Sequence, residues 1–97
     1  MHARVSRFQG SGEGAASRPK VEDVLPTLRE MDGFRGLISL VNGEGGDALA
    51  ITLWETAEAM RASDARADEI RREMANAAGD EIRSVERYEV EALQLDS

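Results

Sequence analysis

The strongest hydrophobic pattern in the chain lies within residues 32–55, where two apolar segments flank a glycine-rich stretch. The segments over about 34–41 and 48–54 are rich in aliphatic residues, and the Asn-Gly and Gly-Gly pairs between them suit the tight connection of a β-hairpin. Apolar residues occupy both alternating sets of positions, and the second segment ends at Trp54, the sole tryptophan. The pattern predicts a hairpin whose two faces both need cover from water.

Side-chain alternation assigns the residues of this hairpin to faces. In the second strand, Thr52 and Trp54 share a face. The first strand divides into two sets, Phe34, Ile38 and Leu40 against Leu37 and Val41. Each face of the hairpin therefore carries large apolar side chains.

Two further segments have the three-to-four-residue spacing of amphipathic helices. The first places apolar residues at 21, 24, 25, 28 and 31, with Pro26 inside the stripe, which predicts a kink or a late start, and with Gly33 well placed as the helix end. The second begins after Thr56, whose hydroxyl suits an N-cap, and continues unbroken to about Ala78.

The first and last strands of the chain complete the order of elements. Residues 2–9 alternate with the two-residue period of a strand, and a last strand is expected over about 81–90. The order β-α-β-β-α-β predicts one α+β domain over residues 1–97, a ferredoxin-like four-stranded antiparallel sheet with both helices on one face. Since helices cover only one apolar face, we expect a homodimer formed through the open sheet face.

The amino-acid composition indicates which classes of binding partner to expect. The 97 residues include 12 basic and 19 acidic ones, a formal net charge of −7, so no basic footprint exists for nucleic acid or anionic membrane surfaces. The sequence has no cysteine, no apolar run long enough to span a membrane, and no signal-like hydrophobic region at its start. We expect a cytoplasmic protein that binds neither nucleic acid nor membrane.

Several kinds of chemistry lack the residues they need. There is no thiol, and the only histidine is His2 at the chain terminus, which disfavours nucleophile-and-base catalysis and histidine metal sites. The glycine-rich run at 10–14 matches neither of the phosphate-binding patterns GxGxxG and GxxxxGK(S/T), and it contains Glu13, whose negative charge would repel a phosphate. We interpret this run as a connector. The carboxylates of the long helix, Asp64, Asp68, Glu69 and Glu73, are interpreted as solvated. We therefore expect no metal and no cofactor.

The remaining candidates are few. Trp54, at the end of a central strand, either fills the core or forms the wall of a pocket. Tyr88 offers a hydroxyl, and Arg4, Ser6 and Thr52 add polar groups if their faces converge. None is a general base near neutral pH, so a reaction here needs a substrate that is itself easily ionised or oxidised.

Particular motifs resemble a known family. DGFRG at 32–36, Leu40-Val41, and AITLWETAEAM at 50–60 resemble the antibiotic-biosynthesis-monooxygenase-like group of the dimeric α/β-barrel superfamily. The resemblance implies a dimeric barrel and, among members of the group, cofactor-independent oxygenation of polyketide-type phenols. It would make Trp54 a catalytic candidate that orients a small aromatic substrate. The chemistry of their own side chains adds Tyr88 and Arg4 as the other catalytic candidates, and Ser6 and Thr52 as further substrate contacts beside Trp54.

The haem-degrading branch of that superfamily can be tested by position. It places an asparagine on the first strand and a tryptophan and a histidine on the long helix, where this chain has Ser6, Ser63 and Glu73. The chain keeps none of the three, which disfavours haem degradation.

Two functions stay open, beside a weaker third idea of a regulatory or storage partner that acts through the acidic helix face. One is a cofactor-independent monooxygenase acting on a small aromatic substrate. The other is a non-catalytic dimeric barrel that binds a small apolar ligand or serves as an assembly module. Pocket volume is the discriminating observation, because a cavity well below about 300 Å3 is smaller than usual ligand sites and would favour packing alone.

Overall fold

The structure, a computed structural model, describes residues 1–10, 21–42, 47–78 and 81–96. The glycine-rich connector, the turn glycines of the hairpin and the predicted stop at Gly79 lie outside these residues. The elements are, in chain order, β1 (His2–Gln9), α1 (Val21–Arg29), β2 (Phe34–Val41), β3 (Ala48–Trp54), α2 (Ala57–Ala62), α3 (Asp64–Ala78) and β4 (Glu81–Glu89).

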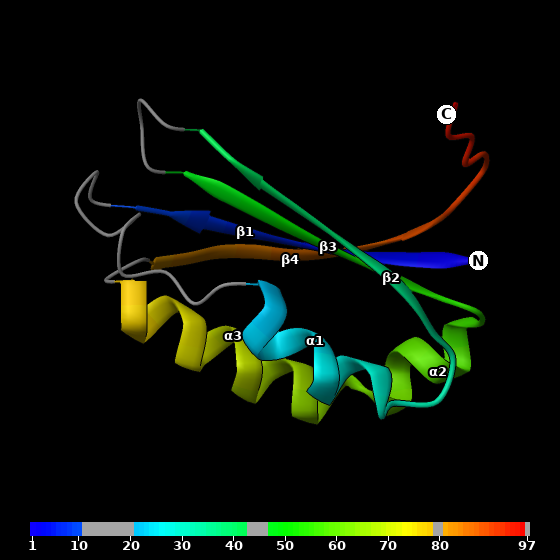
Figure 1. Cartoon of the computed structure of the whole chain (residues 1–97), viewed down its shortest axis with the longest axis horizontal. Coiled ribbons are helices and arrows are strands. Elements are labelled where there is room, and N and C mark those ends of the chain that lie inside the picture. Colours follow the sequence, from blue (N-terminus) through cyan, green and yellow to red (C-terminus); the bar gives the residue numbers. More distant parts are fainter. Residues whose placement is uncertain (11–20, 43–46, 79–80, 97) are drawn as a thin grey trace.

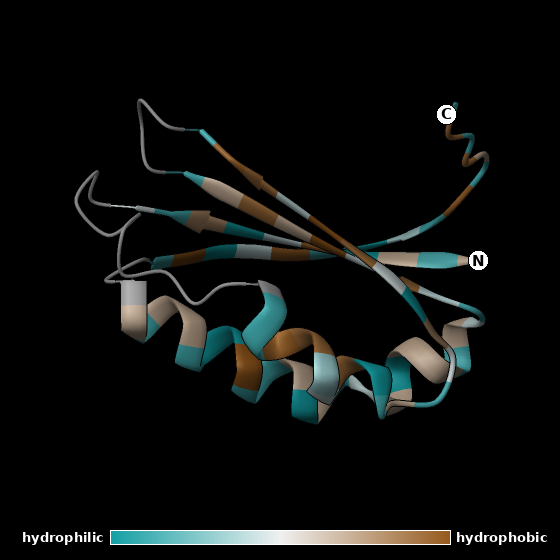
Figure 2. Cartoon of the chain, in the orientation of Figure 1, coloured by the Kyte–Doolittle hydropathy of each residue, from teal (hydrophilic) through white to brown (hydrophobic). Residues whose placement is uncertain are grey.

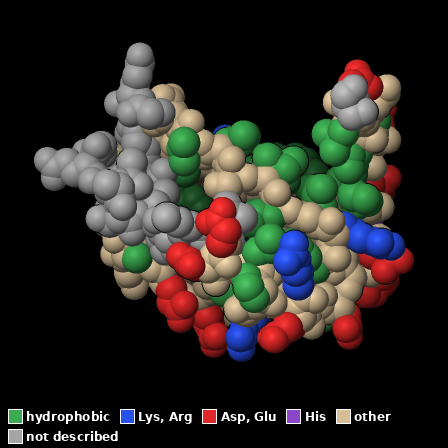
Figure 3. All heavy atoms as spheres, in the orientation of Figure 1, with side chains coloured by type: hydrophobic (Ala, Val, Ile, Leu, Met, Phe, Trp, Pro, Cys, Tyr) green, Lys and Arg blue, Asp and Glu red, His purple; other side chains and the backbone are tan. Residues whose placement is uncertain are grey.

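The four strands form one antiparallel sheet in the order β2-β3-β1-β4. All three helices lie on the same side of it (Figure 1). Hydrophobic stretches follow β2 and β3 (Figure 2), and charged side chains gather over the helical layer (Figure 3). The predicted ferredoxin-like α+β fold is confirmed.

The register of β1 against β3 shows which side chains of the two strands lie on the same face of the sheet. Arg4 lies opposite Thr52, and Ser6 lies opposite Ala50. Because directly opposed residues project to the same side of a sheet, these side chains share the helical face. Arg4 and Ser6 are accordingly buried, whereas Arg7 is exposed.

The prediction that Phe34 shares a sheet face with Ile38 and Leu40 is wrong. The pairing of β2 with β3 shifts between Phe34 and Gly36, so Phe34 lies opposite Trp54. The two rings meet edge to face with centroids 5.5 Å apart. Simple alternation fails here because the irregularity shifts the strand by one position relative to its partner.

The prediction of one unbroken helix after Thr56 is also wrong. Thr56 does cap the helix, its hydroxyl accepting from the Ala59 N–H at 3.0 Å. The helix ends at Ala62, however, and α3 starts after Ser63, whose hydroxyl donates to the Met60 carbonyl at 2.7 Å. The Arg4 guanidinium also donates to that carbonyl. The Met60 carbonyl therefore accepts from two side chains and, at 3.2 Å, from the Ser63 N–H, at the point where α2 ends.

Helix α1 keeps Pro26 inside it and ends at Arg29, earlier than predicted. Gly33 then leads into β2 with a φ of 79°, in the left-handed region, and its carbonyl accepts from the Glu55 N–H at 2.7 Å. A Cβ at this position would lie 2.5 Å from the Ala59 Cβ. Only glycine fits this turn without strain.

Gly33→Ala is therefore expected to lower the free energy of unfolding by about 2 kcal/mol, from positive-φ strain and the clash with Ala59. Gly36→Ala is the matched control, because its Cβ would meet Leu53 at an ordinary 3.6 Å. Urea unfolding of both variants measures the difference. Equal stability of the two variants would contradict this account of the turn.

Candidate functional site

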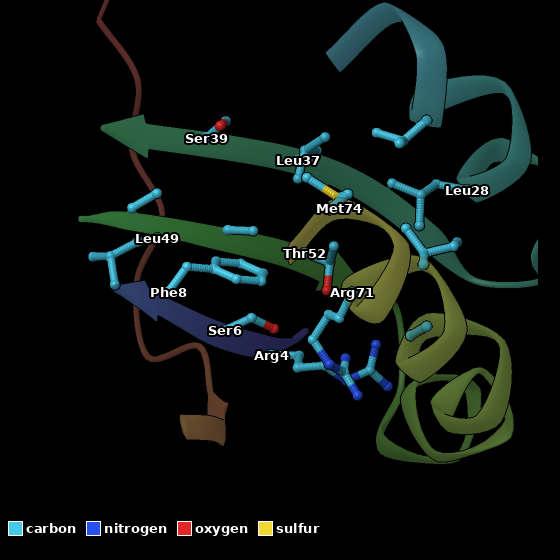
Figure 4. Close-up of a pocket in the computed structure, with 15 residues that line it drawn as sticks. Arg4, Ser6, Phe8, Leu28, Leu37, Ser39, Leu49, Thr52, Arg71 and Met74 are labelled. Atoms are coloured by element: carbon cyan, nitrogen blue, oxygen red, sulfur yellow. The ribbon is translucent and has the colours of Figure 1, made fainter. Parts of the chain in front are cut away.

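A pocket lies between the helical face of the sheet and the helices. It encloses about 80 Å3. Figure 4 shows Phe8, Leu28, Leu37 and Met74 around its apolar part and the nitrogen atoms of Arg4 and Arg71 together at one end. The pocket is therefore apolar along most of its wall and cationic at one end.

Arg4 is the central polar residue of the pocket. Its side chain comes from β1 and is almost completely buried, with 1% of the residue exposed. Nη2 lies 2.6 Å from the Met60 carbonyl oxygen, 2.9 Å from Ser63 Oγ and 2.5 Å from Asp64 Oδ1. Burial lowers the pKa of the Arg4 guanidinium, and the hydrogen bond and charge of Asp64 oppose that shift. The break between α2 and α3 thus supplies the acceptors that hold this cation.

Trp54 packs in the core rather than forming the pocket wall. It is completely buried and does not line the pocket. Its indole N–H donates to Thr52 Oγ1 at 2.9 Å, and the Arg4 guanidinium carbon lies 5.5 Å from its ring centroid. A cation at this distance from an indole face is attracted to it. Trp54 therefore reaches the pocket indirectly, by holding Arg4 and Thr52 in place.

Asp64 links Arg4 to the last strand. The same carboxylate oxygen that pairs with Arg4 lies 3.1 Å from Arg87 Nη2. Desolvation by itself raises the pKa of the Asp64 carboxyl, but hydrogen bonds and charges from Arg87 and Arg4 outweigh it and lower the pKa below its usual value. Asp64 is also the first residue of α3, where the helix dipole favours a negative charge.

Arg71 is the residue of the pocket that sequence analysis missed. Only 8% of it is exposed, and its Nη2 reaches Asp68 Oδ1 at 3.4 Å. Burial lowers the pKa of the Arg71 guanidinium, and the charge of Asp68 opposes this. The sequence held one indication of its position. Arg71 comes four residues after Ala67 and four before Ala75, both of which are buried, so a helix places all three on the same face.

The structure brings together three of the five predicted site residues. Arg4, Ser6 and Thr52 all line the pocket. Trp54 lies behind them, as described above. Tyr88 lies opposite Ala3 on the other face of the sheet, is half exposed, and donates to Glu86 Oε2 at 2.9 Å. Tyr88 is thus separated from the pocket by the sheet.

Within the described ranges, no group of three or more histidine, cysteine or acidic side chains is arranged to hold a metal ion. No helix in the described part of the chain is both long and apolar enough to cross a membrane.

Comparison with known sequences gives relatives without an assigned reaction. The chain is 40% identical over 100 residues to the uncharacterized protein Rv2557 of Mycobacterium tuberculosis, covering 99% of this chain and 43% of that protein. It is 48% identical over 48 residues to the uncharacterized protein Rv2558 of the same organism, covering 50% of this chain and 20% of that protein. The chain thus spans less than half the length of these relatives. No family model matches the chain.

Comparison with solved structures identifies the fold. A proposed antibiotic biosynthesis monooxygenase of Deinococcus radiodurans superimposes with a TM-score of 0.69 at 18% identity, covering 100% of both chains. The ActVA-Orf6 monooxygenase of Streptomyces coelicolor, solved in complex with Nanaomycin D, superimposes with a TM-score of 0.68 at 19% identity, covering 99% of this chain and 92% of that one. This chain therefore has the ferredoxin-like fold of the antibiotic biosynthesis monooxygenase structures, as the sequence motifs predicted.

Proposed function

We propose that the domain binds a small, largely apolar molecule in the pocket between sheet and helices. The observation that carries this proposal is the convergence of Arg4, Ser6 and Thr52 on one wall of an otherwise apolar pocket. A few polar groups in an apolar cavity are the usual make-up of small-molecule sites.

Pocket volume argues against a polycyclic substrate and, by itself, favours side-chain packing over a ligand site. The volume of about 80 Å3 is well below the roughly 300 Å3 of usual ligand sites, so the proposal depends on the polar groups of the wall and not on the size of the pocket. The ligand is therefore small, or it enters by moving side chains on the wall. Met74 is suited to such movement because a thioether side chain is unbranched and flexible.

Native mass spectrometry of protein taken directly from its source cells tests the proposal, because it reports a retained small molecule together with the stoichiometry. The wild-type protein is expected to carry a bound molecule that Ala50→Leu, which fills the pocket, no longer retains. Ala65→Leu on the exposed side of α3 is the control and is expected to retain it. If Ala50→Leu retains the molecule, binding is elsewhere and the proposal fails.

A cofactor-independent monooxygenase is the second candidate. The observation that favours it is the shared fold with a monooxygenase solved in complex with Nanaomycin D. In this chain Arg4 would stabilise negative charge on an ionised aromatic substrate, and Trp54 would hold Arg4 in position. Oxygen uptake with model anthrones should then exceed the rate in buffer. Uptake no faster than buffer across a substrate panel would count against catalysis.

The sheet face without helices supports the proposal of a homodimer. β2 and β3 contribute aliphatic side chains to that face, and Ile38 and Leu40 are 39% and 46% exposed. Such a face is stabilised by burial against a second apolar surface. A second copy of the same sheet supplies one, related by a two-fold axis.

Ile38→Glu is expected to shift the protein from dimer to monomer at micromolar concentration, because a carboxylate would be buried in the proposed interface. Sedimentation equilibrium measures the mass. Ala65→Glu makes the same change of charge on the exposed helical side and is expected to leave the dimer intact. A wild-type monomer under these conditions would contradict the proposal.

A further inference from the structure

Two guanidinium groups at one end of the pocket keep donors without acceptors. Arg4 Nε, Arg4 Nη1 and Arg71 Nε have no hydrogen-bond partner within the described part of the chain, although 1% and 8% of the two residues are exposed. Buried donors of charged groups are costly to leave unpaired. Arg4 and Arg71 both line the pocket, but these nitrogen atoms have almost no accessible surface. A ligand therefore reaches them only when side chains on the pocket wall move.

Nearby carboxylates are too few to neutralise this end of the pocket. Asp64 is shared between Arg4 and Arg87, at 2.5 and 3.1 Å. Asp68 is shared between Arg71 and Arg72, at 3.4 and 3.0 Å. Asp64 and Asp68 are therefore each shared with an arginine that does not line the pocket, Arg87 and Arg72, whose side chains are 42% and 72% exposed. Neither carboxylate is reserved for a pocket arginine among the described residues.

Like charge also acts between the two arginines themselves. Figure 4 shows their nitrogen atoms side by side at the pocket end. Burial lowers the pKa of the Arg4 guanidinium most, and the charge of Arg71 lowers it further. An anion placed between the two groups would remove both the repulsion and the missing hydrogen bonds.

We propose that Arg4 and Arg71 form an anion subsite, so that the ligand of this pocket is a small organic anion with an ionised oxygen at one end and an apolar body. This inference rests on the proposed ligand-binding function and assigns the chemistry of its ligand. A carboxylate fits best, because guanidinium groups match its oxygens with charge-assisted hydrogen bonds. The apolar body lies toward Phe8, Leu28 and Met74.

Fluorescence of Trp54 supplies the assay, because it is the sole tryptophan and lies 5.5 Å from the Arg4 guanidinium carbon. Matched pairs are titrated into the full chain: benzoate against benzamide, hexanoate against hexanamide, and 4-nitrophenolate against 4-nitroanisole. We expect each anion that binds to have an affinity about tenfold higher than that of its neutral partner. This ratio corresponds to the free energy of about one charge-assisted hydrogen bond. Preference for the carboxylates or for the phenolate identifies the source of the ionised oxygen.

Arg71→Met is the test variant, because it removes the cation while keeping an apolar side chain of similar length. It is expected to lose the preference for the anion, and Arg72→Met, whose side chain is 72% exposed, is expected to keep it. Equal affinity for acid and amide in the wild type overturns the anion subsite while leaving the ligand-binding function in place. Failure of every compound in every pair overturns both. If Arg71→Met does not fold, the wild-type acid and amide comparison decides.

Discussion

Trp54→Ala is expected to lower the free energy of unfolding by about 3–5 kcal/mol. The indole is completely buried and contacts the ring of Phe34 edge to face. Its removal also deletes the hydrogen bond to Thr52 and the ring beneath the Arg4 guanidinium. A domain of this size has about 5–15 kcal/mol of stability in total, so the variant loses a large share of it. Urea unfolding followed by circular dichroism measures the change without relying on the lost fluorophore.

Trp54→Phe is the matched control. It keeps an aromatic ring against Phe34 and Arg4 but loses the indole N–H that Thr52 accepts. We expect it to cost about 1–2 kcal/mol, clearly less than alanine. A cost within 1 kcal/mol for Trp54→Ala would contradict its assignment to the core.

Local patterns in the sequence were sufficient to predict the four strands and the order of strands and helices along the chain. Alternation over residues 2–9 and the apolar run ending at Trp54 depend only on neighbours within each strand. The same alternation indicated that Arg4 and Ser6 share a face. It could not predict that this face meets Thr52, because that depends on the register between two strands far apart in the chain.

The two errors of element assignment have a similar cause. Spacing of apolar residues continues across Ser63, so nothing local marks a helix end there. The break involves the guanidinium of Arg4, which lies 59 positions away in sequence and donates to Ser63 and to the Met60 carbonyl. The shift at Phe34 likewise depends on pairing with β3. The shift at Phe34 and the contribution of Arg4 to the break are tertiary contacts, which override local periodicity. The bond from the Ser63 hydroxyl to the Met60 carbonyl is local.

Net charge was misleading about the pocket. The charge of −7 predicts that the chain does not bind nucleic acid, and this stays a prediction. The pocket nevertheless ends in Arg4 and Arg71, which come from β1 and α3. Whole-chain charge averages over such pairs, and only the fold brings these two residues together.

Asp64→Asn is expected to lower the free energy of unfolding at neutral pH by about 2–3 kcal/mol, because it leaves the buried Arg4 cation without its carboxylate. The cost is smaller than for a fully buried pair, since the Asp64 side chain is 37% exposed. Glu55→Gln breaks the exposed pair with Arg35 and is the control, with an expected cost below about 1 kcal/mol. Urea unfolding of both variants measures the contrast.

Acid dependence gives an independent signature of the same pair. The folded-state pKa of Asp64 is lowered, so its contribution is present above the pKa of the unfolded chain and is lost as pH falls through the folded value. The stability difference between wild type and Asp64→Asn should therefore be largest above about pH 5 and shrink toward pH 2. In an Arg4→Met background the effect of Asp64→Asn should fall, because only Arg87 then remains as its partner. A difference that is constant with pH, or unchanged by Arg4→Met, would show that Asp64 does not stabilise the buried cation.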